Sequence, residues 1–202
     1  MKLRILMPLL ICTLSIVLAM NYYVRKAAST PLKYNGIVRL VSPEGDTFCT
    51  GFVVNEKTVM TAGHCALMES FSVVDKDLKF SVKAKFNFVN INSMHSVDVA
   101  TIKGDFSAFE AMVVDFRQDA KIGSKVFAAG YGLGGALHIS YGTVVGFLKF
   151  FIQTKELNLI QGMSGGPMIE AETGKVVGIN SRVDEDSQQF TPMINLDTFV
   201  GL

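Results

Sequence analysis

The sequence has few residues of the kinds that mark chains without a packed core. Only 5 of its 202 residues are proline, and charged residues make up 18% against 49% hydrophobic residues. This composition argues against a disordered or collagen-like chain and predicts a packed globular body. At this length the body is one domain, or two small ones that share a core.

No block of basic residues occurs in the chain, although its formal net charge is +1. Residues 1–35 hold five of the 19 basic residues and no acidic residue, so the remainder has 14 basic against 18 acidic residues, a formal charge of −4. Nucleic-acid binding depends on neutralising phosphates with positive charge. The charge distribution therefore argues against a nucleic-acid partner.

The sequence also lacks the patterns of phosphate-binding loops and metal sites. No P-loop, internal repeat or low-complexity tract occurs, and the three histidines stand apart at positions 64, 95 and 138. We therefore expect no metal and no cofactor.

One long apolar run is present, at the N-terminus. Ile5–Met20 is almost wholly apolar and follows Lys2 and Arg4, which is typical of an export signal. Residues 17–19 have the small-residue spacing that a signal peptidase reads, but twenty helical residues would also span about 30 Å of hydrocarbon. Cleavage and retention as a signal-anchor both stay open. We assign residues 1–35 to this leader and its linker, and expect an extracytoplasmic body. The body is secreted, periplasmic or tethered by the leader, which would be its only contact with a membrane.

Two of the three cysteines, Cys49 and Cys65, follow the export segment. In an oxidising compartment we expect them to pair, which would stabilise the fold by about 3 kcal/mol on the chain-entropy model. Two unpaired buried thiols are the alternative.

The body consists of short β-rich runs separated by Gly, Asn, Asp and Lys, without a sustained helical period. Many short strands with turns between them predict an antiparallel barrel or sandwich. Residues 105–123 have no strong strand signal and divide the runs into two similar groups, which places a junction of two barrels there. We also expect a short helix from Asn195. The predicted strands are residues 37–41, 48–54, 58–61, 80–88, 97–102, 125–129, 143–147, 167–169 and 175–180.

Three separate segments carry residues that suit nucleophilic chemistry. In G-M-S-G-G-P at 162–167, glycines flank a serine and allow a tight turn whose backbone N–H groups converge to stabilise an oxyanion. In T-A-G-H-C at 61–65, a histidine follows a β-run. Asp98 heads an otherwise apolar strand, where an aspartate is costly unless a partner offsets its charge. Taken singly, the three also fit a simple turn, a structural histidine and a surface aspartate.

In the order His64, Asp98, Ser164, these segments resemble the trypsin/chymotrypsin-like serine peptidase family, especially its compact bacterial and viral members. The resemblance covers residues 36–202. It also rests on C-T-G-F-V-V at 49–54, which places the two cysteines at the family's disulfide spacing, on A-G-Y-G at 129–132 and on V-G-I-N-S at 177–181.

The resemblance implies an all-β fold of two antiparallel six-stranded barrels packed around an active-site crevice, with a short C-terminal helix. Residues 36–202 would form one peptidase domain. Barrel 1 would take about residues 36–110, and barrel 2 about residues 120–202.

The same resemblance implies a cofactor-free serine endopeptidase that hydrolyses peptide bonds of a protein or peptide through an acyl-enzyme. His64 would act as the base that activates Ser164, and Asp98 would hold the imidazole in the required tautomer. The backbone N–H groups of Gly162 and Ser164 would bind the developing oxyanion.

Four residues match positions at which members of this family bind their substrates. Ser181, Arg182 and Val183 resemble the edge to which the substrate adds as an extra strand. Asn158, six residues before Ser164, stands at the base of the primary specificity pocket, where it replaces the acid that selects Lys or Arg. We expect a polar or medium-sized apolar side chain before the scissile bond. Glutamate selection is disfavoured because Asn180 stands where such relatives carry a histidine.

The residue before the serine departs from the zymogen-type members of the family. Met163 replaces the aspartate that captures a newly cut N-terminus, so we expect that no such cleavage is needed and that Met163 packs in the core or lines the crevice. An alternative function is a catalytically silent protease-fold binding or scaffold protein with a collapsed oxyanion loop. A chaperone-protease is not expected, because the sequence ends at Leu202 without room for a peptide-binding module.

Overall fold

The structure is a computed structural model, which describes residues 34–90, 97–117, 120–132, 135–148, 151–183 and 188–192. The chain divides into two units, Met1–Leu32 and Lys33–Leu202, and all described residues belong to the second. The predicted leader and the helix expected from Asn195 lie outside the described residues. Within the described part, no helix is long and apolar enough to cross a membrane.

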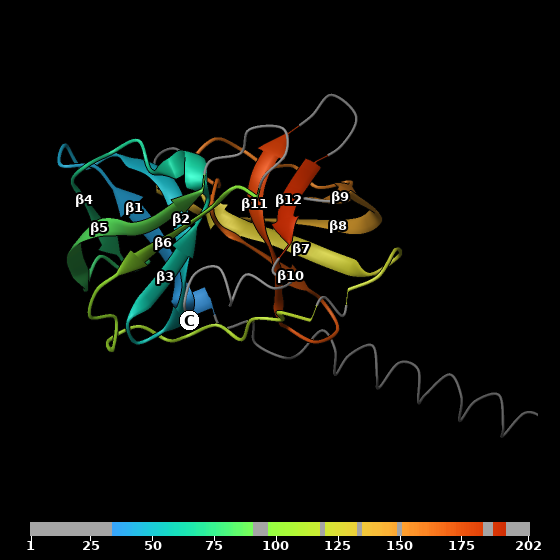
Figure 1. The fold of residues 1–202 in the computed structure, drawn as a ribbon, viewed down its shortest axis with the longest axis horizontal. Coiled ribbons are helices and arrows are strands. Elements are labelled where there is room, and N and C mark those ends of the chain that lie inside the picture. Colours follow the sequence, from blue (N-terminus) through green and yellow to red (C-terminus); the bar gives the residue numbers. More distant parts are fainter. Residues whose placement is uncertain are drawn as a thin grey trace, which may run out of the picture. The chain divides into compact units, whose positions relative to one another are not determined.

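Six antiparallel strands form the first closed barrel, in the order β1-β2-β3-β6-β5-β4 (Figure 1). It closes because β1 pairs with β4 as well as with β2. The two 3-10 turns of the described chain flank this barrel's strands: η1 (Tyr34–Gly36) precedes β1, and η2 (Gly63–Cys65) follows β3. The strands are β1 (Ile37–Val41), β2 (Thr47–Asn55), β3 (Thr58–Thr61), β4 (Phe71–Val74), β5 (Ser81–Asn90) and β6 (Val99–Lys103).

The second closed barrel has the order β10-β11-β12-β9-β8-β7 and closes through the pairing of β10 with β7. Since the described chain contains two antiparallel barrels and no α-helix, the predicted all-β, two-barrel fold is confirmed. The strands are β7 (Lys125–Tyr131), β8 (Leu137–Leu148), β9 (Phe151–Lys155), β10 (Pro167–Glu170), β11 (Val176–Val183) and β12 (Gln188–Pro192).

The nine predicted strands all overlap observed strands, but β4, β9 and β12 were not predicted. β4 has four residues and β9 and β12 have five each, and such short runs carry little periodicity. The β12 sequence Q-Q-F-T-P is also polar and ends in proline, which is a weak strand signal. β8 is longer than its predicted core because its first half contains His138 and Ser140 instead of a continuous apolar run.

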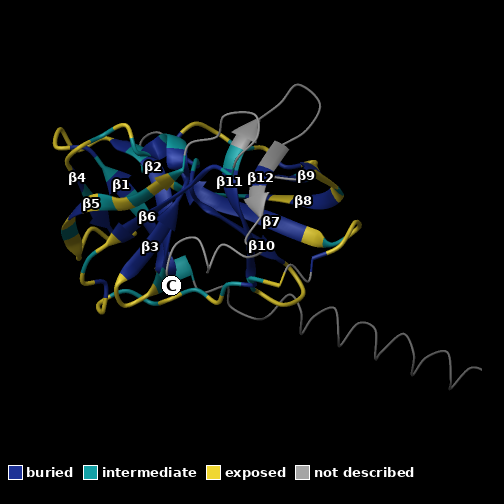
Figure 2. Cartoon of the chain, viewed as in Figure 1, coloured by how far each residue is buried: buried dark blue, intermediate teal, exposed yellow. Residues whose placement is uncertain are grey.

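Apolar side chains that alternate along the strands fill the second barrel. Each of its six strands contributes at least one residue to a single buried cluster, since successive strand residues face opposite sides of the sheet. Figure 2 shows the buried segments along the strands of both barrels. The cluster contains Ala120, Val126, Ala128, Val144, Ile152, Leu157, Met163, Met168, Val177 and Phe190.

A smaller apolar cluster joins the barrels. Ile37 of β1 packs with Ala129 and Tyr131 of β7. The Tyr131 hydroxyl donates a hydrogen bond to the Ile37 carbonyl at 3.3 Å, and burial raises the pKa of Tyr131 to about 12. The Arg39 guanidinium lies 5.5 Å from the centre of the Tyr131 ring, a cation–π contact. These contacts fix β1 and β7 against each other.

Residues 104–124 connect β6 to β7, and the described parts of this connection, residues 104–117 and 120–124, contain no named strand. This segment hydrogen-bonds to both barrels: the Met112 N–H donates to Val53 O, and the Asp115 N–H donates to Val176 O, both at 2.8 Å. The connection therefore contacts both barrels within residues 112–115.

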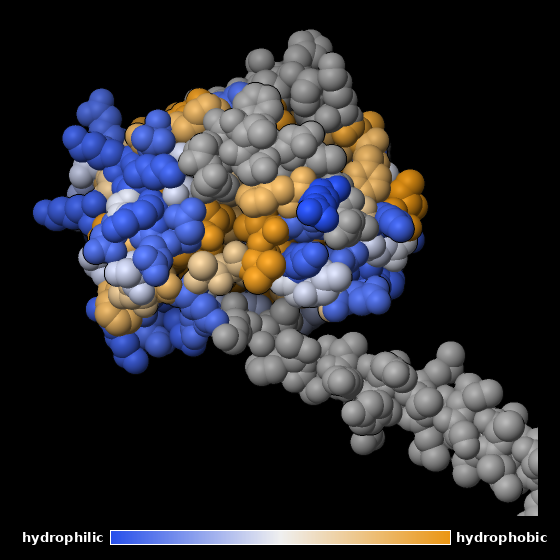
Figure 3. Space-filling model, turned by 60° about the horizontal axis from the view of Figure 1, so that its bottom comes forward, coloured by the Kyte–Doolittle hydropathy of each residue, from blue (hydrophilic) through white to orange (hydrophobic). Residues whose placement is uncertain are grey.

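The two barrels present different surfaces on the face drawn in Figure 3. With the first barrel on the left as in Figure 1, hydrophilic side chains cover most of that side, while apolar side chains gather at the centre and over the second barrel. Four large apolar residues of β8 are exposed: Tyr141, Val145, Phe147 and Leu148. The exposed apolar side chains of the second barrel's described strands are thus concentrated on β8.

Candidate active site

Strand pairing in the first barrel brings His64 and Asp98 together. β3 ends at Thr61, which pairs with Ala100 of β6, so the chain just after β3 meets the chain just before β6. His64 Nδ1 lies 2.7 Å from Asp98 Oδ2, and the His64 backbone N–H donates to Asp98 Oδ1 at 2.9 Å. One carboxylate therefore fixes both the backbone and the ring of the histidine.

The close approach requires the glycine that precedes His64. A Cβ on Gly63 would lie 2.1 Å from Asn90 O and 3.0 Å from Asp98 Oδ1. A side chain at this position would therefore displace β5 or the carboxylate. This accounts for glycine at this position of the T-A-G-H-C segment.

Asp98 is almost fully buried, with 2% of its surface exposed. The Ser181 hydroxyl donates a second hydrogen bond to Asp98 Oδ2 at 2.6 Å. Burial acts to raise the pKa of Asp98, but the hydrogen bonds from His64 and Ser181 outweigh it and hold this pKa below its ordinary value. The group is thus a carboxylate near neutral pH. Because a carboxylate only accepts hydrogen bonds, His64 Nδ1 carries the proton and Nε2 is left as the acceptor.

Ser164 lies in the loop between β9 and β10, next to the segment that carries His64. Its carbonyl accepts a hydrogen bond from the Thr50 N–H at 2.8 Å and lies 3.7 Å from Cys65 Sγ. Cys65 follows His64 directly in the chain, so this loop of the second barrel contacts the segment that carries the histidine. Ser164 is partly exposed, and among the described residues its hydroxyl has no hydrogen-bond partner.

The predicted disulfide is confirmed: Cys49 and Cys65 are joined, with their Cα atoms 6.1 Å apart. A ring nitrogen of His64 and the two sulfur atoms lie within 4.8 Å of one another. This grouping does not make a metal site, because metals bind thiolates and both sulfurs are in the disulfide. It shows instead that the disulfide packs beside the histidine.

The loop of residues 160–166, here called the oxyanion loop, carries the two amides predicted to bind an oxyanion. Within the described chain, no acceptor bonds the N–H of Gly162 or of Ser164. Gly165 has a φ of +82°, and a Cβ there would lie 2.0 Å from Thr61 Oγ1. Only glycine suits this position, on both conformational and steric grounds.

Met163 is fully buried in the apolar cluster of the second barrel, as expected for a core residue. Asn180 is fully buried as well. Its side-chain amide donates to Met163 O at 3.0 Å and to Ala129 O at 3.2 Å. The Asn180 amide group therefore bonds the oxyanion loop, a contact that the sequence motif did not predict.

The residues predicted to contact substrate lie in two places, Asn158 in the loop after β9 and Ser181, Arg182 and Val183 in β11. Asn158 is exposed, and its backbone N–H donates to Ser140 Oγ at 2.7 Å. In β11, the register against β12 shifts between Asn180 and Arg182. Ser181 falls at this irregularity, and its hydroxyl bonds Asp98. Arg182 and Val183 continue β11, and their side chains lie outside the described part of the structure.

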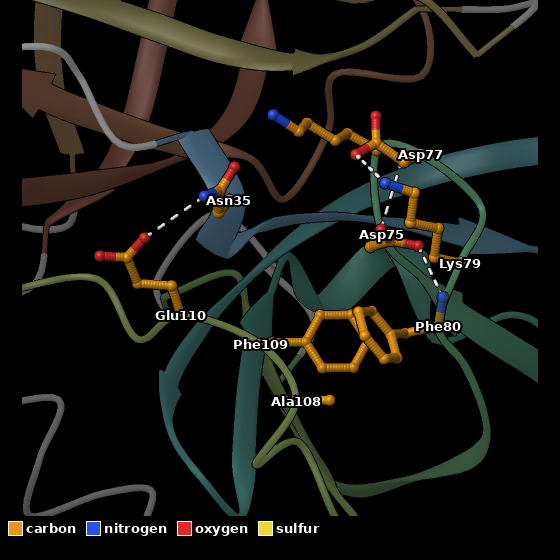
Figure 4. Close-up of a pocket in the computed structure, with 9 residues that line it drawn as sticks. Asn35, Asp75, Asp77, Lys79, Phe80, Ala108, Phe109 and Glu110 are labelled. Atoms are coloured by element: carbon orange, nitrogen blue, oxygen red, sulfur yellow. Dashed lines mark hydrogen bonds and ion pairs between the residues drawn. The ribbon is translucent and has the colours of Figure 1, made fainter.

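A pocket of about 290 Å³ lies at another place in the first barrel (Figure 4). The Phe80 and Phe109 rings, with centroids 6.0 Å apart, form part of its wall, and the Asp75 carboxylate accepts a hydrogen bond from the Phe80 N–H. The pocket contains none of the predicted site residues. Its lining consists of Asn35, Asp75, Lys76, Asp77, Lys79, Phe80, Ala108, Phe109 and Glu110.

Two features of the site were missed from the sequence. The bond from Ser181 to Asp98 joins residues 83 positions apart, and Thr50 joins the oxyanion loop across 112 positions. Thr50 was marked only by its place after Cys49 in C-T-G-F-V-V. Ser181, the last residue of V-G-I-N-S, was predicted to contact the substrate, and its bond to Asp98 was not predicted.

The model of a family described as trypsin-like peptidase domain matches residues 49–179. No curated protein matches the sequence.

Solved structures share the fold. The HtrA-type protease AlgW, solved with a decapeptide, has a TM-score of 0.66 at 17% identity, covering 78% of this chain and 61% of its own. A serine endoprotease from Yersinia pestis has a TM-score of 0.70 at 22% identity, and the match covers 90% of this chain and 64% of that protein. Neuropsin from mouse brain has a TM-score of 0.67 at 18% identity, and the match covers 84% of this chain and 94% of neuropsin. The chain thus spans less than two thirds of the first two proteins.

Proposed function

The chain belongs to the family of trypsin-like peptidase domains, and from this premise we propose that it is a serine endopeptidase in which His64, Asp98 and Ser164 form the catalytic triad. The observation that carries the proposal is the buried Asp98 carboxylate bonded to His64 Nδ1 at 2.7 Å. This bond leaves the second imidazole nitrogen free to accept a proton. A buried acid that orients a histidine beside a glycine-flanked serine suits acyl transfer.

In the proposed reaction, Ser164 Oγ attacks the carbonyl carbon of the scissile peptide bond while His64 Nε2 takes the hydroxyl proton. Asp98 stabilises the imidazolium that forms and keeps the ring in place. The imidazolium then gives its proton to the leaving amine, which produces an acyl-enzyme and frees the new N-terminus. Water, activated by the same imidazole, hydrolyses the ester and restores Ser164.

The tetrahedral intermediates carry a negative oxygen that needs hydrogen-bond donors. We assign this task to the backbone N–H groups of Gly162 and Ser164. The absence of any acceptor for these two amides in the described chain supports the assignment, because a donor meant for an oxyanion must not be engaged beforehand. Each such donor contributes about 10² to 10³ in rate.

We propose a protein or peptide as the substrate, bound as an additional strand along residues 181–183 of β11. The AlgW structures with a decapeptide and with a tripeptide support a peptide ligand for this fold. An extracytoplasmic location is part of the proposal, and it rests on the apolar leader and on the Cys49–Cys65 disulfide.

The proposal is tested by a fluorophosphonate probe, which phosphonylates only an activated serine. We expect the probe to label the wild type covalently and to leave Ser164→Ala unlabelled. His64→Ala should be labelled at least about 10³-fold more slowly, because it retains the hydroxyl and loses the base. Intact-protein mass spectrometry measures the labelled fraction over time.

The matched control is Ser107→Ala, which removes an exposed hydroxyl bonded to Asp105 and should be labelled like the wild type. A folded wild-type protein that takes up no label would contradict the peptidase proposal. It would favour the catalytically silent scaffold instead.

A further inference from the structure

We propose that Thr50 and Asn180 form an uncharged internal brace that holds the oxyanion loop in its active arrangement, a task for which zymogen-type relatives use a charged N-terminus. The inference rests on the proposed peptidase function. We call these two side chains the Thr50–Asn180 brace, and assign both as positioning residues for the Gly162 and Ser164 amides.

The first half of the brace is the Thr50 hydroxyl. It donates to Gly162 O at 2.8 Å and accepts a hydrogen bond from the Tyr131 N–H at 2.8 Å. A hydroxyl has one proton, so the bond accepted from Tyr131 leaves that proton for Gly162 O. Since Thr50 is fully buried, water does not compete for these hydrogen bonds. The Thr50 hydroxyl therefore orients the peptide group between Gly162 and Met163.

Thr50 also bonds the other end of the Gly162–Ser164 segment through its backbone. Its N–H donates to Ser164 O at 2.8 Å, and its own carbonyl accepts from Thr61 Oγ1 at 2.7 Å. One residue of β2 therefore fixes the carbonyls of both oxyanion-binding residues. Both residues that flank Met163 are therefore bonded to one residue of the first barrel.

The second half of the brace acts on the peptide bond between Met163 and Ser164. Asn180 Nδ2 donates to Met163 O at 3.0 Å, and the Gly166 N–H donates to the same oxygen at 3.0 Å. The described chain has no cis peptide bond, and in a planar trans peptide the N–H points opposite to the carbonyl. The two bonds that hold Met163 O therefore also set the direction of the Ser164 N–H.

The packing around the brace leaves no room for a side chain on Gly130. A Cβ on Gly130 would lie 2.9 Å from Met163 Cα and 3.1 Å from Thr50 Oγ1. Glycine at this position lets β7 approach both the loop and the threonine. Because position 163 is a fully buried methionine, it offers no carboxylate to a charged N-terminus.

The experiment compares Thr50→Val, Thr50→Ser and Thr101→Val in the full chain. Valine keeps the shape of threonine and removes the hydroxyl, whereas serine keeps the hydroxyl. Thr101 is the matched control, since it is a fully buried threonine of β6 whose hydroxyl has no partner among the described residues. A fluorophosphonate probe reports on the oxyanion site without a known peptide sequence, and varying its concentration separates the maximal labelling rate from the probe affinity.

We expect Thr50→Val to lower the maximal labelling rate by about 10- to 100-fold with little change in probe affinity. This is less than the 10² to 10³ that the loss of a whole oxyanion donor costs, because the amide is misdirected and not removed. Thr50→Ser should restore the rate to within about threefold of the wild type, and Thr101→Val to within about twofold. Labelling is measured well below each variant's melting temperature, so a purely structural role would leave the rate unchanged.

Three outcomes would overturn the brace: a wild-type rate in Thr50→Val, an equal loss in Thr50→Ser, or an equal loss in Thr101→Val. If Thr50→Val does not fold, Asn180→Ala tests the brace from the second barrel and should show the same selective fall in maximal rate. A folded wild type that is never labelled would overturn the peptidase function together with the brace. An active wild type with an unaffected Thr50→Val would overturn the brace alone.

Discussion

Asp98 illustrates how a single buried carboxylate is kept ionised in this protein. Its environment is nearly dry, which by itself favours the neutral acid. Three hydrogen bonds, two from His64 and one from Ser181, favour the anion, and the net result is a lowered pKa. The residue is therefore held as an anion beside the His64 ring, as the proposed triad requires.

The lowered pKa of Asp98 predicts how stability depends on pH. Because the folded-state pKa lies below that of the unfolded chain, about 3.9 for an aspartate, the ionised group stabilises the fold above that value. This stabilisation is lost as the pH falls through the folded-state pKa. We expect Asp98→Asn to show a smaller fall in the free energy of unfolding between about pH 5 and pH 2 than the wild type.

Urea unfolding followed by circular dichroism at several pH values measures this difference. Asp105→Asn serves as the control. Asp105 is fully exposed, and although the hydrogen bonds from Ser107 lower its pKa as well, solvent screening makes such a shift worth little in stability. Identical pH dependence in the wild type and Asp98→Asn would contradict the assignment.

Among the elements of the first barrel, β2 contacts two separate parts of the site. It carries Cys49, whose disulfide reaches η2, and Thr50, which reaches the oxyanion loop. It also pairs with both β1 and β3. β2 therefore links the first barrel directly to the oxyanion loop of the second barrel.

Removing the disulfide should weaken this region. We expect the double variant Cys49→Ala/Cys65→Ala to lose about 2 to 4 kcal/mol of unfolding free energy, since the crosslink restricts the unfolded chain. Denaturant unfolding of both proteins measures the loss. A reducing agent should destabilise the wild type by a similar amount and leave the double variant unaffected. Equal stability of the two proteins under oxidising conditions would contradict a stabilising role for the disulfide.

For the whole molecule, the two barrels meet at a seam that combines apolar and polar contacts. Ile37, Ala129 and Tyr131 form its apolar centre, and the hydrogen bonds of Thr50 cross it close to the oxyanion loop. These groups are buried and uncharged, while the Ser181–Asp98 hydrogen bond and the contact of Arg39 with the Tyr131 ring add charged groups that also join the two barrels.

A chain organised in this way should not depend on where its N-terminus is cut. We expect proteins that begin at different residues between Met20 and Lys33 to be labelled by a fluorophosphonate at rates within about threefold of one another. Zymogen-type activation would instead require one particular N-terminus, because its new ammonium group must reach a buried acid. A sharp dependence on a single starting residue would exclude the internal brace as a sufficient support.

The sequence by itself determined the class of fold and singled out the candidate reactive residues. Short apolar runs with turns between them predict β-strands because their apolar pattern can be recognised within a few adjacent residues, and G-M-S-G-G-P and T-A-G-H-C are likewise motifs of adjacent residues. Strands such as β4 and β12 escaped detection because their pairing, and not their own composition, makes them strands.

Only the tertiary structure decided which residues support the reactive ones. Thr50 and Gly162 are 112 positions apart, and Asp98 and Ser181 are 83 apart. Such pairs leave no local pattern, because they meet only when two barrels close and pack together. Asn180 shows the same point: its place in the sequence suggested a specificity pocket, whereas its buried amide group bonds the oxyanion loop. Contacts between distant strands are set by the packing of the whole domain, and for that reason they had to be read from the structure.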